Sequence, residues 1–372
     1  MKPAYYIGVM SGTSLDGIDT VLADFSGPSP VLQKTFFLPY DETLRSQLLA
    51  LHQPGDDELN RAALLSNQLS QLYAKAVIGL LQQSKISPQQ VVAIGCHGQT
   101  VRHCPETEKR YTIQLVNAAL LAELTQITVV VDFRSRDIAA GGQGAPLVPA
   151  FHQAIFRSVD VSRVIVNIGG IANITSLGLG HQAVAGFDCG PGNLLLDAWC
   201  LRHTGQVYDK NGDWAAQGKI IGDLLKKLHE TTHFFTLPPP KSTGRDLFNI
   251  QWLDDYLSGD EAVEDVQATL LQLTVTTIAD SIDKYCASAS EIYICGGGAH
   301  NRLLIDCLRE ALPNRKVSLT DELGVAADWV EAYAFAWLAQ QAILGRPANL
   351  PAVTGAKGER ILGAIYPGLK LF

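Results

Sequence analysis

Two short apolar runs near the start of the chain flank one glycine-rich turn. Residues 5–10 predict a buried strand, and residues 20–25 predict its antiparallel partner. The turn at 10–19 reads Met-Ser-Gly-Thr-Ser-Leu-Asp-Gly-Ile-Asp and contains two glycines, three hydroxyls and two carboxylates. Glycines let backbone N–H groups face outward, so this turn is suited to phosphate oxygens, and Asp16 and Asp19 are of the type that binds Mg²⁺ beside a nucleotide. An ordinary glycine-rich hairpin is the alternative.

The same order of strand, glycine-rich turn and strand is predicted again near the middle of the chain. A strand predicted at 164–168 runs into Gly169 and Gly170, and a second strand follows at 171–175. Later in each half a short apolar strand again meets glycine, at 91–98 and at 292–298. The identity between the halves is too low for a formal repeat, so the pattern predicts a structural duplication, with two similar lobes that face each other across a cleft.

Helical segments alternate with these strands. Apolar residues recur at helical spacing over 57–84 and 262–286, and strands alternating with such helices indicate an α/β fold. With 372 residues and 47% hydrophobic content, the chain is long enough for two domains. Charged residues followed by a glycine-rich run indicate a boundary between 132 and 144. We predict an N-terminal lobe of residues 1–135 and 340–372, and a C-terminal lobe of residues 136–339.

The charge balance bears on the partners. The net charge is −8 and no cluster of Lys and Arg stands out, which argues against nucleic-acid binding. No apolar run reaches the roughly 18 residues that cross a bilayer, so we expect no membrane partner and a cytoplasmic protein. The seven cysteines are dispersed without a C-x-x-C pair, which favours reduced thiols and predicts neither disulfides nor a zinc site.

Asp188 is the first candidate for a catalytic carboxylate. It lies in the run Gly186–Asn193, between a short predicted strand and a predicted helix for which Asn193 is the candidate N-cap. A carboxylate there can act as a general base on water or on a sugar hydroxyl. Closure of a cleft would raise its pKa by desolvation, whereas the helix end would lower it. An Asp that only bonds the nearby backbone is the alternative.

Four further motifs have two interpretations each. Gly296–Gly298 suit either close approach to an adenosine or a plain tight turn. Arg134 can bind a substrate carboxylate, or pair with Asp132 or Asp137. His97 can orient a ligand or be a hydrogen-bonded turn histidine. Glu331 is either a second catalytic carboxylate or an acidic residue at a helix N-terminus.

Taken together, the motifs resemble the anhydro-N-acetylmuramic acid kinase family. The main matches are Gly8–Asp19, Asn167–Asn173 and Gly186–Asn193, and further matches are Cys96–Thr100, Asp132–Arg134, Pro239–Arg245, Gly296–Gly298 and Thr354–Lys357. This resemblance spans nearly the whole chain. It implies the fold of the sugar kinase, actin and heat-shock ATPase superfamily, in which two ribonuclease-H-like lobes surround a central nucleotide cleft. Unlike that superfamily, the chain has no Asp just before its Gly-Thr turn, where Val9 and Met10 stand.

The resemblance also implies the reaction. The substrates would be 1,6-anhydro-N-acetylmuramic acid, ATP and water, and the products N-acetylmuramic acid 6-phosphate and ADP, in the recycling of the bacterial cell wall. Asp188 would activate the water, and Glu331 would help to hold it. The sugar would be bound by His97, Arg134 and Asn167, and Mg²⁺ by Asp16 and Asp19. The nucleotide would be bound by Gly12, Thr13, Ser14, Leu15, Asp16, Gly17, Ile18, Asp19, Gly169, Gly170, Gly296, Gly297 and Gly298.

Two other functions are compatible with the same motifs. A kinase for levoglucosan would share the turns and the chemistry but would need no arginine for a lactyl carboxylate. An actin-like or chaperone-type ATPase would use the same cleft to drive assembly or partner binding. The family resemblance favours the anhydro-amino-sugar kinase, and it also implies a homodimer.

Overall fold

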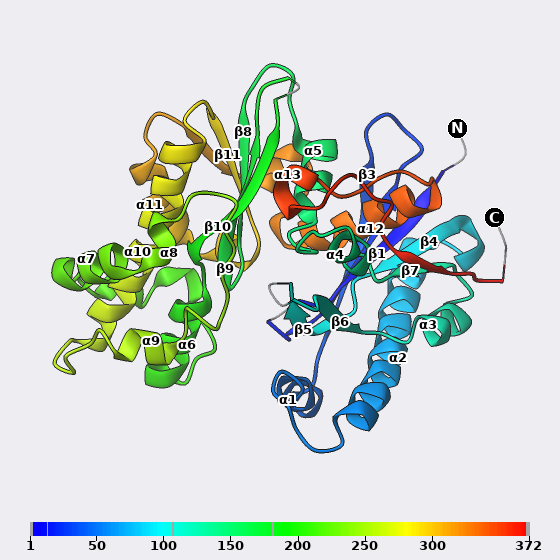
Figure 1. The fold of residues 1–372 in the computed structure, drawn as a ribbon, viewed down its shortest axis with the longest axis horizontal. Helices are drawn as coiled ribbons and strands as arrows, with labels where there is room; N and C mark the ends of the chain where they lie inside the picture. Colours follow the sequence, from blue (N-terminus) through cyan, green and yellow to red (C-terminus); the bar gives the residue numbers. More distant parts are fainter. Residues whose placement is uncertain (1–2, 13, 106–107, 181, 370–372) are drawn as a thin grey trace. The chain divides into compact units, whose positions relative to one another are not determined.

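The computed structural model describes residues 3–12, 14–105, 108–180 and 182–369 (Figure 1). The chain forms two compact units. The first comprises Met1–Ile155 and Trp329–Phe372, and the second comprises Phe156–Asp328. Each unit has its own mixed sheet with helices packed on it, which confirms the predicted α/β class.

The first unit is built on a six-stranded sheet of order β13-β7-β4-β1-β2-β3. Its three N-terminal strands are antiparallel neighbours, β4 runs parallel to β1, and β7 runs parallel to β4. The strands are β1 (Tyr5–Met10), β2 (Gly17–Asp24), β3 (Val31–Pro39), β4 (Val91–Cys96), β7 (Val129–Val131) and β13 (Ala364–Tyr366); a separate hairpin pairs β5 (Gln99–Cys104) with β6 (Tyr111–Leu115).

The second unit repeats this order. Its five-stranded sheet is arranged β10-β9-β8-β11-β12, again with three consecutive antiparallel strands followed by two parallel ones. The strands are β8 (Arg163–Ile168), β9 (Ile171–Leu177), β10 (Val184–Pro191), β11 (Glu291–Cys295) and β12 (Lys316–Leu319). The shared order confirms the prediction of two similar lobes that each open with a strand, a glycine-rich turn and a second strand.

Helices cover both sheets. The first unit contains α1 (Glu42–Ala50), α2 (Glu58–Ser84), α3 (Ala118–Thr125), α4 (Ser135–Ala139), α12 (Val330–Ile343) and α13 (Pro351–Thr354), with α5 (Val148–Phe156) at its end. The second contains α6 (Leu194–Thr204), α7 (Gly222–Thr231), α8 (His233–Thr236), α9 (Ile250–Asp254), α10 (Val263–Tyr285) and α11 (Arg302–Ala311). The predicted helices over 57–84 and 262–286 are therefore confirmed as α2 and α10. Among the described residues, no helix is both long enough and apolar enough to cross a membrane.

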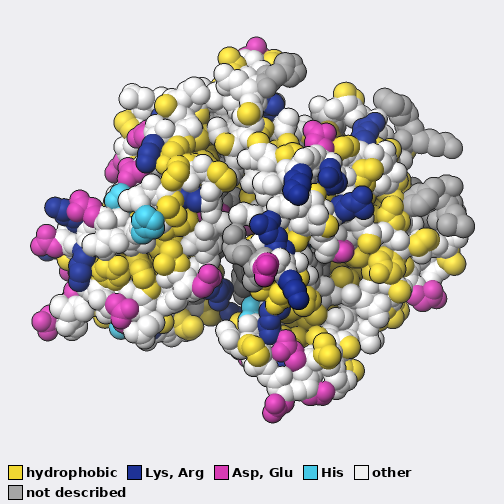
Figure 2. All heavy atoms as spheres, viewed as in Figure 1, with side chains coloured by type: hydrophobic (Ala, Val, Ile, Leu, Met, Phe, Trp, Pro, Cys, Tyr) yellow, Lys and Arg dark blue, Asp and Glu magenta, His cyan; other side chains and the backbone are white. Residues whose placement is uncertain are grey.

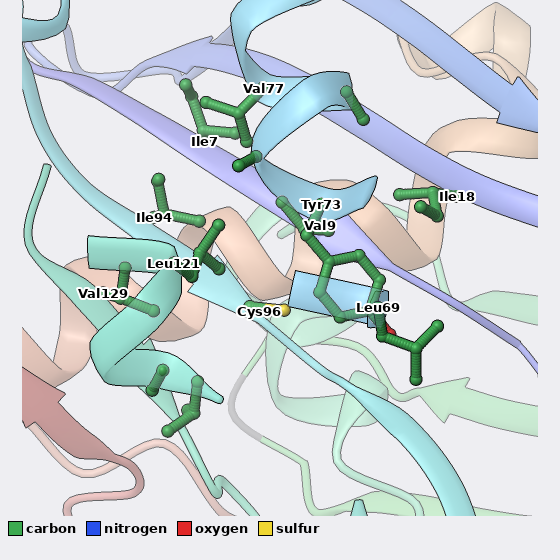
Figure 3. Close-up of a cluster of buried hydrophobic side chains, with 14 of the residues drawn as sticks. Ile7, Val9, Ile18, Leu69, Tyr73, Val77, Ile94, Cys96, Leu121 and Val129 are labelled. Atoms are coloured by element: carbon green, nitrogen blue, oxygen red, sulfur yellow. The ribbon is translucent and has the colours of Figure 1, made fainter. Parts of the chain in front are cut away.

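The core of the first unit lies on both faces of its sheet. Alternate residues of a strand point to opposite faces, and Ile7, Val9 and Ile94 pack against α2 residues such as Tyr73 and Val77 (Figure 3). Gly8, between Ile7 and Val9, faces α12 instead, where an added Cβ would overlap the carbonyl of Ala332. Glycine on β1 therefore lets α12 lie directly against the sheet.

The compact units differ from the predicted lobes at both boundaries. The sequence prediction divided the chain at 339/340, within α12, but α12 is one continuous helix that packs on β1, β2 and β4. The prediction also assigned residues after 135 to the second lobe. In the structure the ring of Phe151 on α5 packs against Tyr333 and Trp337 of α12, at centroid distances of 5.2 and 6.3 Å. These apolar contacts hold residues 136–155 in the first unit.

Charged side chains of both signs are interspersed over the face of the molecule shown in Figure 2. The net charge of −8 is therefore not concentrated on this face as a single acidic patch.

Candidate active site

The predicted phosphate-binding turn connects β1 to β2 in the first unit. Leu15 has a φ of 56° and its side chain is buried, so it anchors the turn in the core. Next to it, the Ser14 hydroxyl donates to Oδ1 of the exposed Asp16 at 2.7 Å. Asp19 lies on β2, half-buried. Thr13 lies outside the described residues.

Two side chains outside the turn hold its ends. The Nε2 of buried Gln99 donates to the carbonyl of Gly12 at 3.1 Å, and its Oε1 accepts from the hydroxyl of Ser11. Tyr40 bonds Ser11 Oγ through its hydroxyl at 2.7 Å, and its backbone N–H donates to the carbonyl of Asp16 at 3.0 Å. Gln99 belongs to the matched motif Cys96–Thr100 but had no role predicted, and Tyr40 was missed, because they contact the turn from β5 and from the end of β3.

His97 and Arg134, both predicted to bind substrate, lie together in the first unit. His97 Nε2 accepts from Nη2 and Nε of Arg134 at 2.9 and 3.2 Å, so its proton lies on Nδ1, which donates to the carbonyl of Ser11 at 3.3 Å. Burial, together with the charge of Arg134, lowers the pKa of His97 to about 3, so the imidazole is neutral. His97 thereby links Arg134 to the start of the phosphate turn.

Arg134 also binds the glycine-rich loop after α4. Its Nη1 donates to the carbonyl of Gly144 at 2.8 Å. Burial lowers the pKa of Arg134 to about 10, and the carboxylate of Glu331 acts in the opposite direction. Glu331 therefore lies near enough to Arg134 to influence it, at the start of α12. Within the described residues the structure shows no ion pair between Arg134 and either Asp132 or Asp137.

In the second unit, the β8–β9 turn packs against the start of α6. The backbone N–H of Asn193 donates to the carbonyl of Gly169 at 2.8 Å, and that of Gly192 donates to Gly170 at 2.9 Å. Asn193 precedes α6 as predicted, but its side chain does not cap the helix and donates instead to the carbonyl of Ile168 at 3.2 Å. The predicted N-cap position is therefore confirmed, but the capping hydrogen bond is not formed, because the backbone of Asn193 is in the αR region (φ −81°, ψ −15°) and not in the extended region that is usual for a capping side chain.

The glycines after β11 contact the same corner. Gly296 has a φ of 80°, and a Cβ there would overlap Oδ1 of Asn167. A Cβ on Gly298 would overlap the side chain of Ile168. Glycine at these positions therefore lets the β11–α11 turn close on the end of β8. The structure thus brings together Asn167, the Gly169–Gly170 turn and the Gly296–Gly298 run.

Asp188 lies half-buried on β10, in the second unit, next to a bulge in its pairing with β9. Its backbone N–H donates to the carbonyl of Lys241 at 3.0 Å. Its Oδ2 accepts from Ser242 Oγ and from the backbone N–H of Thr243, both at 2.9 Å. Burial raises the pKa of Asp188, while these two hydrogen bonds and the charge of Lys241 act in the opposite direction. Burial outweighs these lowering effects, so the pKa of Asp188 lies above its ordinary value.

Sequence reasoning did not foresee the environment of Asp188. Ser242 and Thr243 belong to the run Pro239–Arg245, which matched a family motif but had no role assigned to its members. Nor did it single out Asp197 on α6, whose pKa burial raises to about 7 against the opposing charge of Arg245. The proline-flanked polar run was the available signal, but only the fold shows that it meets β10.

The family model and the sequence relatives agree with each other. The family model described as anhydro-N-acetylmuramic acid kinase matches residues 4–368. A protein of that name from Nitrosospira multiformis is 65% identical, covering 99% of this chain and 100% of its own length. One from Nitrosomonas europaea is 63% identical, covering 98% and 99%. A solved ROK family glucokinase from Streptomyces griseus, in complex with glucose and AMPPNP, is only 13% identical with a TM-score of 0.42, covering 91% of this chain and 100% of its own, and carries no functional argument.

The two bacterial relatives and the family model each extend over nearly the entire chain, through both compact units. The span matched by the family model, residues 4–368, contains every motif described above. The chain therefore belongs to the anhydro-N-acetylmuramic acid kinase family.

Proposed function

We propose that this protein is an ATP-dependent kinase that opens the 1,6-anhydro ring of 1,6-anhydro-N-acetylmuramic acid and phosphorylates O6. The observation that carries the proposal, beside the family membership, is Asp188. Its carboxylate is half-buried, its pKa is raised by burial, and one of its oxygens is fixed by two donors. A carboxylate that is held in place and made more basic is what general-base catalysis requires.

The substrate explains why a base must act on water. O6 of the sugar is bonded to C1 in a bicyclic ether, so there is no free 6-hydroxyl to deprotonate. Asp188 takes a proton from water as the water oxygen bonds to C1 and the C1–O6 bond breaks. O6 then bonds to the γ-phosphorus, and ADP departs with the electron pair of the broken P–O bond. The first half resembles an inverting glycosidase, in which a carboxylate directs water to the face opposite the leaving oxygen. Glu331 helps to hold the water.

The nucleotide would be bound by backbone groups of the glycine-rich turns. Phosphoryl transfer needs mainly alignment and charge neutralisation, which the turn at 12–19 supplies through its N–H groups and hydroxyls. Gly169–Gly170 and Gly296–Gly298 would approach the rest of the nucleotide. Mg²⁺ binds well to one or two carboxylates beside phosphate oxygens, and the exposed Asp16 and half-buried Asp19 fit that donor set. The ion would neutralise phosphate charge.

The sugar would be bound by His97, Arg134 and Asn167. A guanidinium has five N–H donors, and the hydrogen bonds of Arg134 to His97 and Gly144 use three of them. Within the residues that the structure describes, one N–H on each terminal nitrogen has no acceptor, and two such donors match paired recognition of the lactyl carboxylate. Because His97 fixes the guanidinium plane, the two donors are oriented before the sugar binds.

The reaction is tested with purified protein in a coupled ADP assay with a panel of anhydrosugars. We expect ADP release that depends on 1,6-anhydro-N-acetylmuramic acid, with levoglucosan a poor substrate because it lacks the lactyl group. In ¹⁸O-labelled water the label should appear at the anomeric carbon of the product. Label in the phosphate would indicate simple ATP hydrolysis, and equal turnover of levoglucosan would indicate a general anhydrosugar kinase.

The role of Asp188 is tested by Asp188→Asn. We expect sugar phosphate formation to fall by at least about 10³-fold, since an amide accepts no proton from water, while ATP binding stays nearly unchanged. The matched control is Asp254→Asn, which removes a carboxylate of the same unit that pairs with Arg202 on the surface and should leave turnover near the wild-type value. Unchanged turnover in Asp188→Asn would remove this residue from the mechanism.

The setting follows from the product. N-acetylmuramic acid 6-phosphate is formed from a fragment of cell wall, so the enzyme would serve a bacterium that recycles its own peptidoglycan. We place it in the cytoplasm, where ATP is available, and expect a homodimer. Gel filtration with light scattering would test the dimer.

A further inference from the structure

Among the described residues, only one of the two carboxylate oxygens of Asp188 accepts hydrogen bonds. The hydrogen bonds to its carboxylate, from Ser242 Oγ and from Thr243 N–H, both reach Oδ2. For Oδ1, the described part of the chain shows no hydrogen-bond donor. Since Asp188 N–H also donates to the carbonyl of Lys241, three consecutive residues of one loop bond the backbone and one oxygen of this residue. The carboxylate plane is thereby fixed with Oδ1 free of these contacts.

We propose that Ser242 is a positioning residue for Asp188, whose hydroxyl fixes Oδ2 so that Oδ1 is presented to the attacking water. This inference rests on the proposed function. Thr243 binds the same oxygen through its backbone, so its contact survives any change of side chain. Ser242 is the one of the two donors that substitution can remove, and its side chain is exposed, so its loss leaves the core intact.

Few charged groups act on this carboxylate. Among the described residues, Lys241 is the charged side chain that shifts the pKa of Asp188. Its Nζ lies 4.5 Å from the centre of the Phe234 ring and donates to the carbonyl of Phe234 at 3.2 Å. Cys189 on β10 is a neutral thiol because burial raises its pKa. On α10, the charge of Lys284 lowers the pKa of Lys241, and the Tyr285 hydroxyl donates to the carbonyl of Leu237. On α8, the ring of His233 contacts the hydroxyl of Thr236. Strand β9 contains no titratable residue.

The direction of the effect follows from the bond. A donor to Oδ2 stabilises the ionised carboxylate, so removal of the Ser242 hydroxyl raises the pKa of Asp188 further. The base must be ionised to accept a proton, so the acidic limb of the pH profile of kcat/KM moves to higher pH. Because water partly replaces an exposed hydroxyl, we expect a fall of about three- to tenfold at pH values below the limb and little change on the plateau.

The test compares Ser242→Ala with Ser242→Thr, which keeps a hydroxyl. The pH profile of kcat/KM for the anhydro-amino sugar is measured at saturating ATP. The nucleotide and the sugar carboxylate titrate in the same way for every variant, so they cannot cause a difference between the profiles. We expect the limb to move upward in Ser242→Ala and to return towards the wild-type position in Ser242→Thr. Ser258→Ala is the matched control, because the Ser258 hydroxyl also bonds a carboxylate, that of Glu261 at 2.8 Å, in the same unit.

A second readout needs no turnover. In protein labelled with ¹³C at the Asp side-chain carboxyls, the resonance absent from Asp188→Asn reports the titration of Asp188, which should move upward in Ser242→Ala. A titration and a pH profile that both coincide with wild type would overturn the role of Ser242, and so would an equal loss of activity at every pH. If Asp188→Asn keeps its turnover, it is instead the proposed function that fails.

Discussion

His97 and His152 are buried neutral histidines of the first unit. Their side chains are 5% and 1% exposed. Burial lowers the pKa of each to about 3, with the charge of Arg134 contributing at His97. In the unfolded chain a histidine has its ordinary pKa near 6.5, so below that pH the unfolded state binds protons that the native state excludes.

Stability should therefore fall as the pH drops from about 6.5 towards 3. At pH 5 each histidine costs on the order of 2 kcal/mol relative to pH 7.5, from the linkage between pKa and unfolding free energy. Urea unfolding at several pH values measures this slope. His152→Asn should lower stability at neutral pH but reduce the slope, because it removes one of the two buried neutral histidines. Parallel curves for wild type and His152→Asn would contradict the prediction.

At single residues, the sequence predicted which side chains matter better than what they contact. His97 and Arg134 were chosen separately, and no spacing rule places them in one hydrogen-bonded pair. Gln99 and Tyr40 hold the phosphate turn by contacts across long stretches of chain, as Ser242 holds Asp188. Local pattern carries no information about such contacts, because they depend on how strands from different parts of the chain are arranged in the sheet.

At the scale of elements, the periodicity of hydrophobic residues in the sequence correctly predicted the strands that open each half and the two long helices α2 and α10. It left the close packing of α12 on β1 unforeseen, and Gly8 makes that contact possible. From sequence, Gly8 is only a small residue in an apolar strand. Its requirement for glycine comes from the backbone of Ala332, more than three hundred residues later in the chain.

Gly8→Ala should therefore destabilise the protein strongly. The new methyl group would overlap the helix backbone, which cannot rotate away as a side chain can, so α12 must move off the sheet at a cost of about 3 kcal/mol or more. The control is Gly222→Ala at the start of α7, where a Cβ meets nothing within 4 Å and the change should be neutral or slightly stabilising. Thermal unfolding followed by circular dichroism measures both, and equal midpoints would refute the packing argument.

At the scale of the whole molecule, duplication was predictable and the lobe boundaries were not. Each half begins with a strand, a glycine-rich turn and a strand, and the two sheets share one order. The first unit, however, is completed by Trp329–Phe372. Buried Asp137 holds this C-terminal segment to the rest of the first unit, because it accepts hydrogen bonds from Gly144 N–H, Asn349 Nδ2 and Thr354 Oγ1. Such long-range pairing leaves no local mark in the sequence.

This discontinuity predicts how fragments behave. Residues 156–328 form a continuous segment with a complete sheet, so this fragment should fold alone and show a cooperative thermal transition. Residues 1–155 alone should not, because they lack α12, which covers β1, β2 and β4, and the partners of Asp137 at 349 and 354. Adding residues 329–372 through a flexible linker should restore the transition.

Circular dichroism and amide-proton NMR dispersion distinguish these cases. The linked fragment with Asp137→Ala is the control for the contacts of the C-terminal segment. It keeps α12 but leaves Asn349 and Thr354 without their buried acceptor. Its unfolding free energy should be lower by about 3 kcal/mol, so its thermal transition should occur at a lower temperature. A native-like spectrum from residues 1–155 alone would show that α12 and the C-terminal segment are dispensable for the first sheet. Failure of 156–328 to fold would show instead that the second unit depends on the first.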